Sequence, residues 1–463
     1  MAGAITRDNE TETATRRAAP HDGAPTPSGH LGRFVALSLA TGLIVAALLV
    51  ALPFVPVQEG AITGAVLCGF ASGWAVLWLF SQRLTDHPQR WAAAPALFMG
   101  VGGLLLMVFG SPLREALGWI WPPTLLALVI WMMRRTRRDL PSRSGRGQLY
   151  LVFAVLAASA VGGGYEAVGG ATDSNALPAT GQLIEVGGHK LYLNCVGSGG
   201  PTVVLEPGAG GTSSELGWIT PPMAAHTRVC VYDRAGRGWS EPADSPQDGA
   251  QIATDLHTLL HRAGEPGPYV LAGHSLGGLY VRIFAAHYPD EVAGLVLVDS
   301  TASKEPAKAV VRPSDDSFDQ QVGRAPAVAS LAARVGLARL LGQLNWGELP
   351  PDSRSEIRTS NAQASWVRST VDEYLRAGAS AQEAASLRDL GDKPLFVVTA
   401  GRHPESWMEQ QSKMLALSTN SVQEVVAGAA HIDLLIDRTY AAATAQALLA
   451  VVDSARTGRP LGR

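Results

Sequence analysis

The chain has 463 residues, of which 47% are hydrophobic and 17% charged, and its formal net charge at pH 7 is −3. This length allows two or three domains, and the average hides a division: residues 1–170 carry 13 Arg, no Lys and 9 acidic residues, whereas residues 171–463 carry 24 basic and 31 acidic residues. Neither part has the basic excess of a nucleic-acid-binding protein, and the three cysteines lack the spacing of zinc ligands, so we expect no nucleic-acid partner and no metal.

The N-terminal third predicts a tail followed by membrane helices. Residues 1–32 contain almost no large apolar side chains, which predicts a disordered tail. Long apolar segments then predict a transmembrane region of about five helices over residues 33–170, because about 20 apolar residues cross a bilayer as a helix. The segments are 34–55, 61–80, 91–110, 117–133 and 149–165. The last two are short and contain Pro122-Pro123 or a glycine run, and the role of the helices beyond anchoring stays open.

The arginines of this third predict its orientation. Basic residues favour the cytoplasmic side of a membrane, and they gather before the first apolar segment and between the fourth and the fifth. They are Arg16, Arg17, Arg33, Arg134, Arg135, Arg137, Arg138, Arg143 and Arg146. We therefore expect a multi-pass protein of the cell membrane, in contact with the lipid bilayer, with a cytoplasmic tail and with residues 171–463 on the extracytoplasmic side.

From residue 171 onward, short β-branched runs alternate with amphipathic stretches. "QLIEVGGHKLYLNCVG" predicts a hairpin that turns at Gly187-Gly188. "TVVLE", "RVCVYD", "YVLAG", "GLVLVD" and "PLFVVTAG" then predict buried strands, with helical patterns between them. Strands that alternate with helices indicate a mostly parallel sheet with helices on both faces. Residues 171–463 are therefore expected to form one α/β domain.

A candidate nucleophile lies in the stretch Gly273-His274-Ser275-Leu276-Gly277. This GxSxG pattern follows the predicted strand "YVLAG" and opens the helical pattern "LGGLYVRIFAAHYP". That strand-turn-helix setting holds a nucleophilic serine exposed on a sharp turn. The alternative is a structural serine in a glycine-rich turn, but the context favours Ser275 as the nucleophile.

Because a serine hydroxyl is a weak nucleophile at neutral pH, it needs a base to take its proton. His431 in "VAGAAHIDLLID" has the expected order in the chain, downstream of the serine and in a loop before the C-terminal helix. His403 and His287 compete for this role. His287 lies on the helix after the serine, where a structural role fits better.

The carboxylate that orients this base has two candidates. Asp299 ends the predicted strand "AGLVLVD", at the carboxyl edge of the sheet where catalytic groups collect. Glu405 follows the next strand, and "TAGRHP" places Arg402 and His403 where an acid would be expected. We favour Asp299, although a carboxylate at a strand end can also serve only to bind the amides of a turn.

The oxyanion that forms during acyl transfer needs hydrogen-bond donors. "LEPGAGG", residues 205–211, follows a predicted strand and offers a flexible backbone. We expect the N–H groups of Ala209 and Leu276 to form the oxyanion hole. A phosphate-binding loop is the alternative for such a glycine cluster, but the Lys-Ser or Lys-Thr pair that this loop requires is missing.

Together these motifs resemble the α/β-hydrolase superfamily, in particular the serine branch with an "LExGxGG" loop, a "VCxYDRAGxGWS" segment and "GHSxGG". The resemblance covers residues 181–452 and implies an eight-stranded, mostly parallel sheet, with the serine after the fifth strand. It also implies a helical lid after the sixth strand, at about residues 300–392. Pro207 stands where many members have a histidine, which should alter the support of the loop, and the usual acid after the seventh strand is missing.

The resemblance implies a serine hydrolase, esterase-like or lipase-like, that cleaves a carboxylic ester or related acyl bond of a small molecule through an acyl-enzyme and needs no cofactor. Peptidase, thioesterase or cofactor-free haloperoxidase activity would use the same triad. A serine nucleophile argues against the epoxide hydrolases and dehalogenases of this superfamily, which use an aspartate. A membrane sensor or binding protein that has kept the fold without catalysis is the alternative from another class.

The superfamily's usual strand order also implies a disulfide. It makes the strand that ends at Cys195 a neighbour of the strand that contains Cys230. On the extracytoplasmic side, where disulfides persist, we expect a Cys195–Cys230 bond, with Cys68 an apolar residue of a membrane span. Two buried free thiols are the alternative.

Overall fold

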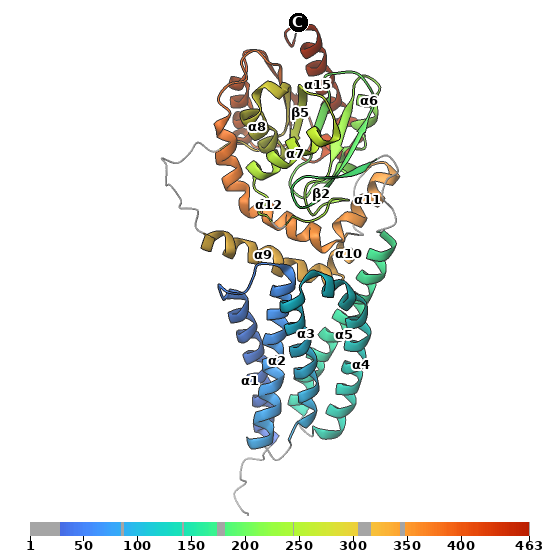
Figure 1. Ribbon diagram of the computed structural model, residues 1–463, viewed down its shortest axis with the longest axis vertical. Coiled ribbons are helices and arrows are strands. Elements are labelled where there is room, and N and C mark those ends of the chain that lie inside the picture. The colour runs from blue at the N-terminus through green and yellow to red at the C-terminus, as the bar shows by residue number, and fades with distance from the viewer. Residues whose placement is uncertain are drawn as a thin grey trace, which may run out of the picture.

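The computed structural model describes residues 28–84, 88–140, 143–173, 181–243, 245–303, 316–342 and 348–462. A bundle of long helices forms one end of the molecule, and an α/β region forms the other (Figure 1). Residues 1–27 of the predicted tail lie outside the described residues.

Five long helices form the bundle: α1 (Ser28–Ala51), α2 (Glu59–Leu84), α3 (Ala93–Phe109), α4 (Ser111–Asp139) and α5 (Arg143–Asp173). All five are long and apolar enough to cross a membrane. Residues 28–32, assigned to the tail from the sequence, form the start of α1. The helix begins directly after Pro27, the last proline of the predicted tail. Helix α4 continues through Pro122-Pro123, and α5 extends beyond the predicted boundary at residue 170.

Small residues let the first three helices approach closely. A Cβ atom on Gly73 would lie 2.6 Å from the carbonyl oxygen of Ser38 in α1, and one on Gly64 would lie 2.5 Å from that of Gly103 in α3. The outer faces instead carry large apolar side chains, such as Leu48, 60% exposed, and Val108, 73% exposed. Small residues between helices and apolar side chains outside are typical of a bundle surrounded by lipid.

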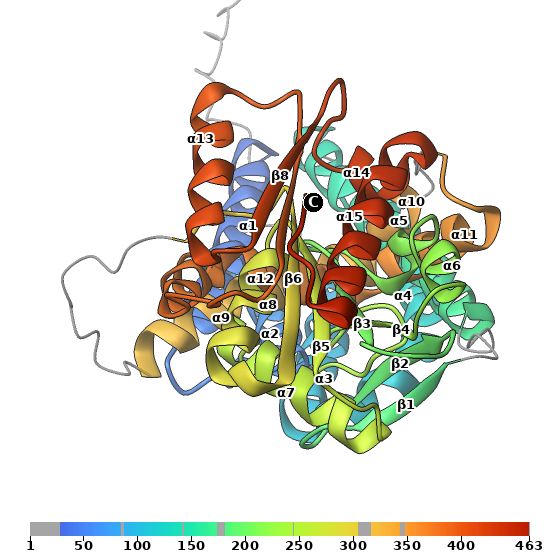
Figure 2. The same cartoon turned by 90° about the horizontal axis from the view of Figure 1, so that it is seen from above.

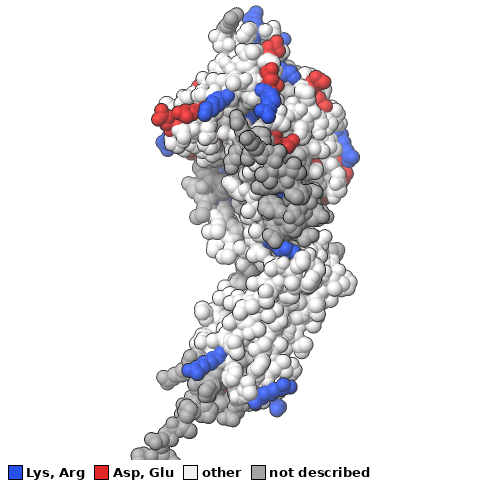
Figure 3. Space-filling model, turned by 90° about the vertical axis from the view of Figure 1, so that its left-hand side faces the viewer, with Lys and Arg blue, Asp and Glu red and all other residues white. Residues whose placement is uncertain are grey.

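Basic residues on the described part of the bundle gather at the end away from the α/β region. Helix α2 carries Arg83 in its last turn, and α4 ends with Arg137 and Arg138 in its last turn. Figure 3 shows this face of the bundle as almost free of charged side chains between its basic lower end and the α/β region.

Eight strands form one sheet in the order β1-β2-β4-β3-β5-β6-β7-β8. They are β1 (Gln182–Glu185), β2 (Lys190–Val196), β3 (Val203–Glu206), β4 (Val229–Tyr232), β5 (Tyr269–His274), β6 (Val292–Val298), β7 (Leu395–Ala400) and β8 (Ser421–Val426). Strands β3 to β8 are parallel, and β1 and β2 are antiparallel to their neighbours. This confirms the predicted eight-stranded, mostly parallel sheet. The sheet twists strongly when it is seen from above (Figure 2).

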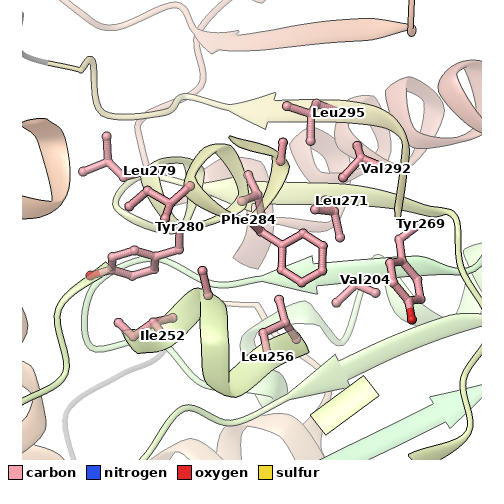
Figure 4. Packing of buried hydrophobic residues seen from close by; sticks show 14 of the residues in the cluster. Val204, Ile252, Leu256, Tyr269, Leu271, Leu279, Tyr280, Phe284, Val292 and Leu295 are labelled. Carbon is pink, nitrogen blue, oxygen red and sulfur yellow. The ribbon is translucent and has the colours of Figure 1, made fainter. Parts of the chain in front are cut away.

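Helices bury both faces of the sheet. On one face, α7 (Gly249–Ala263) and α8 (Gly277–His287) pack against β5 through Leu256, Leu271 and Phe284 (Figure 4). On the other face, α15 (Arg438–Thr457) packs against the next residues of the same strand, Val270 and Ala272. Because successive residues of a strand point to opposite faces, each central strand contributes to both cores, as the continuous apolar runs in the sequence predict.

Among the described residues between β6 and β7, where the resemblance implies a lid, four α-helices are found. They are α9 (Asp316–Arg334), α10 (Leu337–Leu341), α11 (Pro351–Asn361) and α12 (Ala364–Glu383). Helix α9 lies between the bundle and α12 (Figure 1). We refer to α9–α12 as the lid.

The structure joins Cys195 and Cys230 in a disulfide. The two residues are direct partners in the antiparallel pairing of β2 with β4, which brings their side chains to the same face of the sheet. Cys68 in α2 is a free cysteine.

Candidate active site

Ser275 lies on the sharp turn between β5 and α8, with a φ of 54°. This left-handed conformation is unfavourable for a residue with a side chain, and the surrounding glycines make it possible. A Cβ on Gly273 or Gly278 would collide with neighbouring atoms, and one on Gly277 would lie 2.5 Å from the carbonyl oxygens of Glu206 and Pro207. The GxSxG pattern therefore has a steric cause in this fold, and it leaves the Ser275 side chain half-buried at the carboxyl edge of the sheet.

His431 and Asp299 meet at the same edge. His431 lies in the loop after β8, and its Nδ1 is 2.5 Å from Oδ2 of Asp299, the residue that follows β6. The Asp299 carboxylate is fully buried. Since Nδ1 is engaged by Asp299, Nε2 is the nitrogen of His431 that remains for proton transfer.

Four donors surround the Asp299 carboxylate. Oδ2 lies 2.6 Å from Nε2 of His403 as well as close to His431, and Oδ1 accepts hydrogen bonds from the Trp407 indole at 2.9 Å and from the Ala400 amide at 3.2 Å. Burial alone would raise the pKa of Asp299, but the hydrogen bonds from His431 and Trp407 outweigh it and hold the pKa below its usual value. The carboxylate is thus kept ionised beside the imidazole.

The competing candidates for the acid and the base do not replace Asp299 and His431 in the structure. Glu405 is the exposed first residue of α13 (Glu405–Lys413). His287 forms a surface pair with Glu383 at 3.0 Å, in line with a structural role. His403, considered above as a competing base, instead contacts the acid and stacks on Trp407 with ring centroids 4.7 Å apart.

His274 supports the loop that carries His431. Its Nε2 lies 3.0 Å from the carbonyl oxygen of His431. Burial and then the charge of His431 lower the pKa of His274 to about 3. The ring is therefore neutral, and Nε2 carries the proton because a carbonyl can only accept.

The loop after β3 lies against the serine. A Cβ on Gly208 would lie 2.9 Å from Nδ1 of His274 and 3.1 Å from Cβ of Ser275, so the glycine lets the backbone pass close to the serine turn. The predicted donor Ala209 is the next residue, and Leu276 lies at the start of α8, where the first N–H groups of a helix lack partners within it. The two predicted oxyanion donors thus lie on the segments that flank Ser275.

A buried ion network supports this loop, and the sequence analysis did not find it. Arg234 donates to the carbonyl oxygens of Pro207 at 2.9 Å and Gly208 at 2.6 Å, and it also binds Glu206. Glu373 on lid helix α12 pairs with Arg234 at 2.7 Å and with Arg237 at 2.8 Å. Arg234 and Arg237 belong to the "YDRAGRGWS" segment, which was the available signal. Arg234 thus supports the loop through the carbonyl groups of Pro207 and Gly208.

The lid contacts the loop at a second point. Trp366 of α12 donates its indole N–H to the carbonyl oxygen of Gly210 at 2.7 Å. Trp366 and Glu373 are seven residues apart, two turns along one face of the helix. The conformation of this loop, which we refer to as the oxyanion loop because it carries the predicted donor Ala209, therefore depends on the position of α12.

Asp299, His403 and His431 also form a possible metal-binding set among the described residues, with donor atoms within 4.8 Å of one another. Their contacts of 2.5 and 2.6 Å are those of hydrogen bonds. Two ligands of one tetrahedral zinc ion would lie about 3.3 Å apart. The geometry is that of a carboxylate shared by two imidazoles.

The family model described as "alpha/beta hydrolase fold" matches residues 201–434, half of the chain. The chain belongs to the α/β-hydrolase fold family. The match begins just before β3 and ends in α14 (Asp433–Ile436), so it contains the serine turn, Asp299, the lid and His431.

Individual relatives of this hydrolase-fold protein are distant. An uncharacterized protein of Schizosaccharomyces pombe is 28% identical over 292 residues, which are 55% of this chain and 53% of that protein. The chain thus spans about half the length of this curated relative. An uncharacterized vacuolar membrane protein of Saccharomyces cerevisiae is 39% identical over 74 residues, 16% of this chain and 12% of that protein. Among solved structures, the epoxide hydrolase CorEH has a TM-score of 0.46 at 20% identity, covering 58% of this chain and 98% of that one.

Proposed function

We propose that this protein is a membrane-anchored serine hydrolase that cleaves a carboxylic ester or related acyl bond through an acyl-enzyme. The observation that carries the proposal is the contact between the buried Asp299 and the half-buried His431, at the sheet edge where Ser275 stands on a strained turn. The glycine-rich loop packed against Ser275 adds the donors that an oxyanion would need.

In the proposed mechanism, Oγ of Ser275 attacks the acyl carbon while Nε2 of His431 takes its proton. Asp299 stabilises the imidazolium that forms, and the N–H groups of Ala209 and Leu276 hold the oxyanion. His431 then gives the proton to the leaving alcohol. A water molecule, activated by the same imidazole, attacks the acyl-enzyme and releases the acid and free Ser275.

The anchoring half of the proposal rests on the five apolar helices and their exposed outer faces. We propose that residues 33–170 are the membrane region and residues 171–463 the catalytic domain. By the positive-inside rule, the basic residues at the far end of the bundle favour the cytoplasmic side for that end, so the catalytic domain would lie on the other side.

The test is hydrolysis of soluble esters by the purified full-length chain and by Ser275→Ala and His431→Ala variants. Each variant is expected to lose at least about three orders of magnitude in kcat, since triad members act as a unit, with unchanged circular dichroism. Ser412→Ala, on α13 away from the turn, is the matched control and should keep the wild-type rate. A folded His431→Ala variant with a near-normal rate would remove His431 from the mechanism, and turnover by Ser275→Ala would refute the serine mechanism.

A further inference from the structure

We infer that the substrate is a long-chain acyl ester drawn from the bilayer, which reaches Ser275 from the side of the helical bundle. This inference rests on the proposed function, and it adds the class of the substrate and the direction from which it enters. It follows from the placement of the lid between the bundle and the sheet.

A continuous series of contacts runs from the bundle to the catalytic edge. In α9, Arg324 donates to the carbonyl oxygen of Leu52 at 2.9 Å, and Ala327 is fully buried against residues of α2 such as Ile62. The opposite side of α9 packs against α12, and α12 contacts the oxyanion loop through Trp366 (Figure 1). The carboxyl edge of the sheet, with Ser275, therefore faces the bundle.

The turn between α9 and α10 is seated on helix α5. Arg339 pairs with Glu166 at 2.8 Å, and both side chains are largely buried. A side chain on Gly162 would collide with the carbonyl of Val335, and one on Gly169 would collide with the Arg339 guanidinium. Gly162, Glu166 and Gly169 share one face of the helix at spacings of four and three residues. Gly162 in the fifth apolar segment and Gly169 just after it thus belong to the docking face for the lid.

This docking sets the depth of the lid relative to a membrane. Gly162, Glu166 and Gly169 all belong to the candidate span Gly145–Thr172. Helix α10 therefore lies beside the last three turns of that span. A bilayer that covers the span reaches the level of α10.

An exposed apolar surface is found at this level, and we call it the lid patch. It consists of Leu337, Leu340 and Leu341 on α10, which are 49%, 64% and 62% exposed, and of Tyr165 and Val168 on α5, which are 50% and 56% exposed. The two helices are held together here, since the Arg339 guanidinium also lies 6.0 Å from the centre of the Tyr165 ring.

The lipid bilayer is the occupant that fits the lid patch. The patch follows the exposed apolar side chains of the same candidate span, which include Leu151, Val155 and Val161. Through α9 and α12, the lid connects a surface that fits lipid with the loop that packs against Ser275. A soluble substrate would need none of these apolar side chains.

The experiment compares two esters with the same leaving group, the butyrate and the oleate of 4-methylumbelliferone, with the full-length protein in phosphatidylcholine vesicles. The wild type is expected to show a kcat/KM at least about tenfold higher for the oleate. Leu340→Gln with Leu341→Gln is expected to lower the oleate value about tenfold and leave the butyrate value within about twofold, because two leucines lose their lipid contact. The matched control, Leu183→Gln with Val425→Gln, changes exposed residues on the outermost strands β1 and β8 and should alter neither value.

Three results would overturn the inference. Hydrolysis of the butyrate without the oleate would exclude a long-chain substrate and leave the serine hydrolase intact. An oleate rate that the α10 variant does not change, or equal losses on both esters, would exclude the bilayer as the occupant of the lid patch. Failure of both esters together with no labelling of Ser275 by a fluorophosphonate would instead refute the proposed function. The Leu340→Gln, Leu341→Gln variant is shown to be folded if the fluorophosphonate labels its Ser275 as fully as that of the wild type.

Discussion

Asp299 is the residue on which the proposed chemistry depends most at the smallest scale. It is fully buried, it adopts a positive φ of 44°, and its two oxygens receive four donors. A carboxylate at this strand end that served only to bind turn amides would not face two imidazoles. The stretch after β7 contributes to this site through His403, which contacts the acid that follows the neighbouring strand β6.

The first prediction concerns the two carboxylates. Asp299→Asn should lower kcat/KM for an ester by about three to four orders of magnitude, because an amide neither stabilises the imidazolium nor selects its tautomer. Glu405→Gln, at an exposed position, should change it less than about twofold. Both variants are compared by initial rates after circular dichroism has shown that they are folded. The reverse ranking would move the acid to the segment after β7.

A second prediction concerns Glu215, which is fully buried next to the ion network. Burial raises its pKa to about 7, although Arg237 and Arg234 oppose this shift. Between about pH 4.5 and pH 7 the folded protein therefore holds a proton that the unfolded chain has released, so the free energy of unfolding falls as the pH rises through this window. Glu215→Gln cannot titrate and should escape this loss, which amounts to at most about 3 kcal/mol.

Thermal unfolding at pH 5 and pH 8 measures this effect. The stability of Glu215→Gln relative to the wild type should rise between the two pH values, and Glu405→Gln should show no such rise. A difference between Glu215→Gln and the wild type that stays constant from pH 5 to pH 8 would show that Glu215 is ionised in the folded protein throughout.

At the scale of the elements, the sequence predicted what local patterns determine. The strand-turn-helix around Ser275 is visible in the sequence because its glycines and apolar runs are contiguous. The partners Glu373 and Arg234 lie 139 residues apart, and nothing in the spacing of either side chain indicates the other. His403 was noticed, but its role depends on the adjacency of β6 and β7, which places it beside Asp299.

The membrane segments show the same limit. Pro122-Pro123 and the glycines of the fifth segment destabilise a helix in general. They therefore made the fourth and fifth segments the less certain membrane spans in the sequence. In the structure, α4 passes through both prolines, and Gly162 and Gly169 provide room for the lid. The glycines are visible in the sequence, but the residues that need the room, Val335 and Arg339, lie more than 150 residues further along the chain.

The third prediction tests the link between the lid and the oxyanion loop. Glu373→Gln should destabilise the protein by about 3 kcal/mol, because it leaves two buried arginines short of one charge, and should lower ester turnover at least about tenfold through the loop that Arg234 holds. Glu383→Gln, near the exposed end of the same helix, should cost less than about 1 kcal/mol and keep the wild-type rate. Chemical denaturation and initial rates measure both. Equal effects of the two changes on stability and on turnover would show that the ion network does not support the active site.

At the scale of the whole molecule, the bundle, the lid and the sheet form a series in which the catalytic edge faces the bundle. An anchor that only tethered an enzyme would not need a lid docked on α5 by a buried ion pair. With the substrate path that we infer, this arrangement would give the five helices a role beyond anchoring, which the sequence alone left open.

The fourth prediction is the side of the membrane on which the α/β region lies. An alkaline phosphatase fused after Arg463 should be active, and a fluorescent protein at the same place should not, because five spans with basic residues at the far end place the C-terminus outside. In the same preparation, Cys195 and Cys230 should resist alkylation in denatured protein until a reductant is added. A reporter that is active only in the cytoplasm would reverse the orientation.

The central claim is that Ser275 is an activated nucleophile. It is tested most directly by treating the full-length protein with a fluorophosphonate and locating the adduct by mass spectrometry of its peptides. The account predicts one stoichiometric adduct on the peptide that contains Ser275, and its complete loss in Ser275→Ala. No adduct on the wild type, or equal labelling of the wild type and Ser275→Ala, would contradict it.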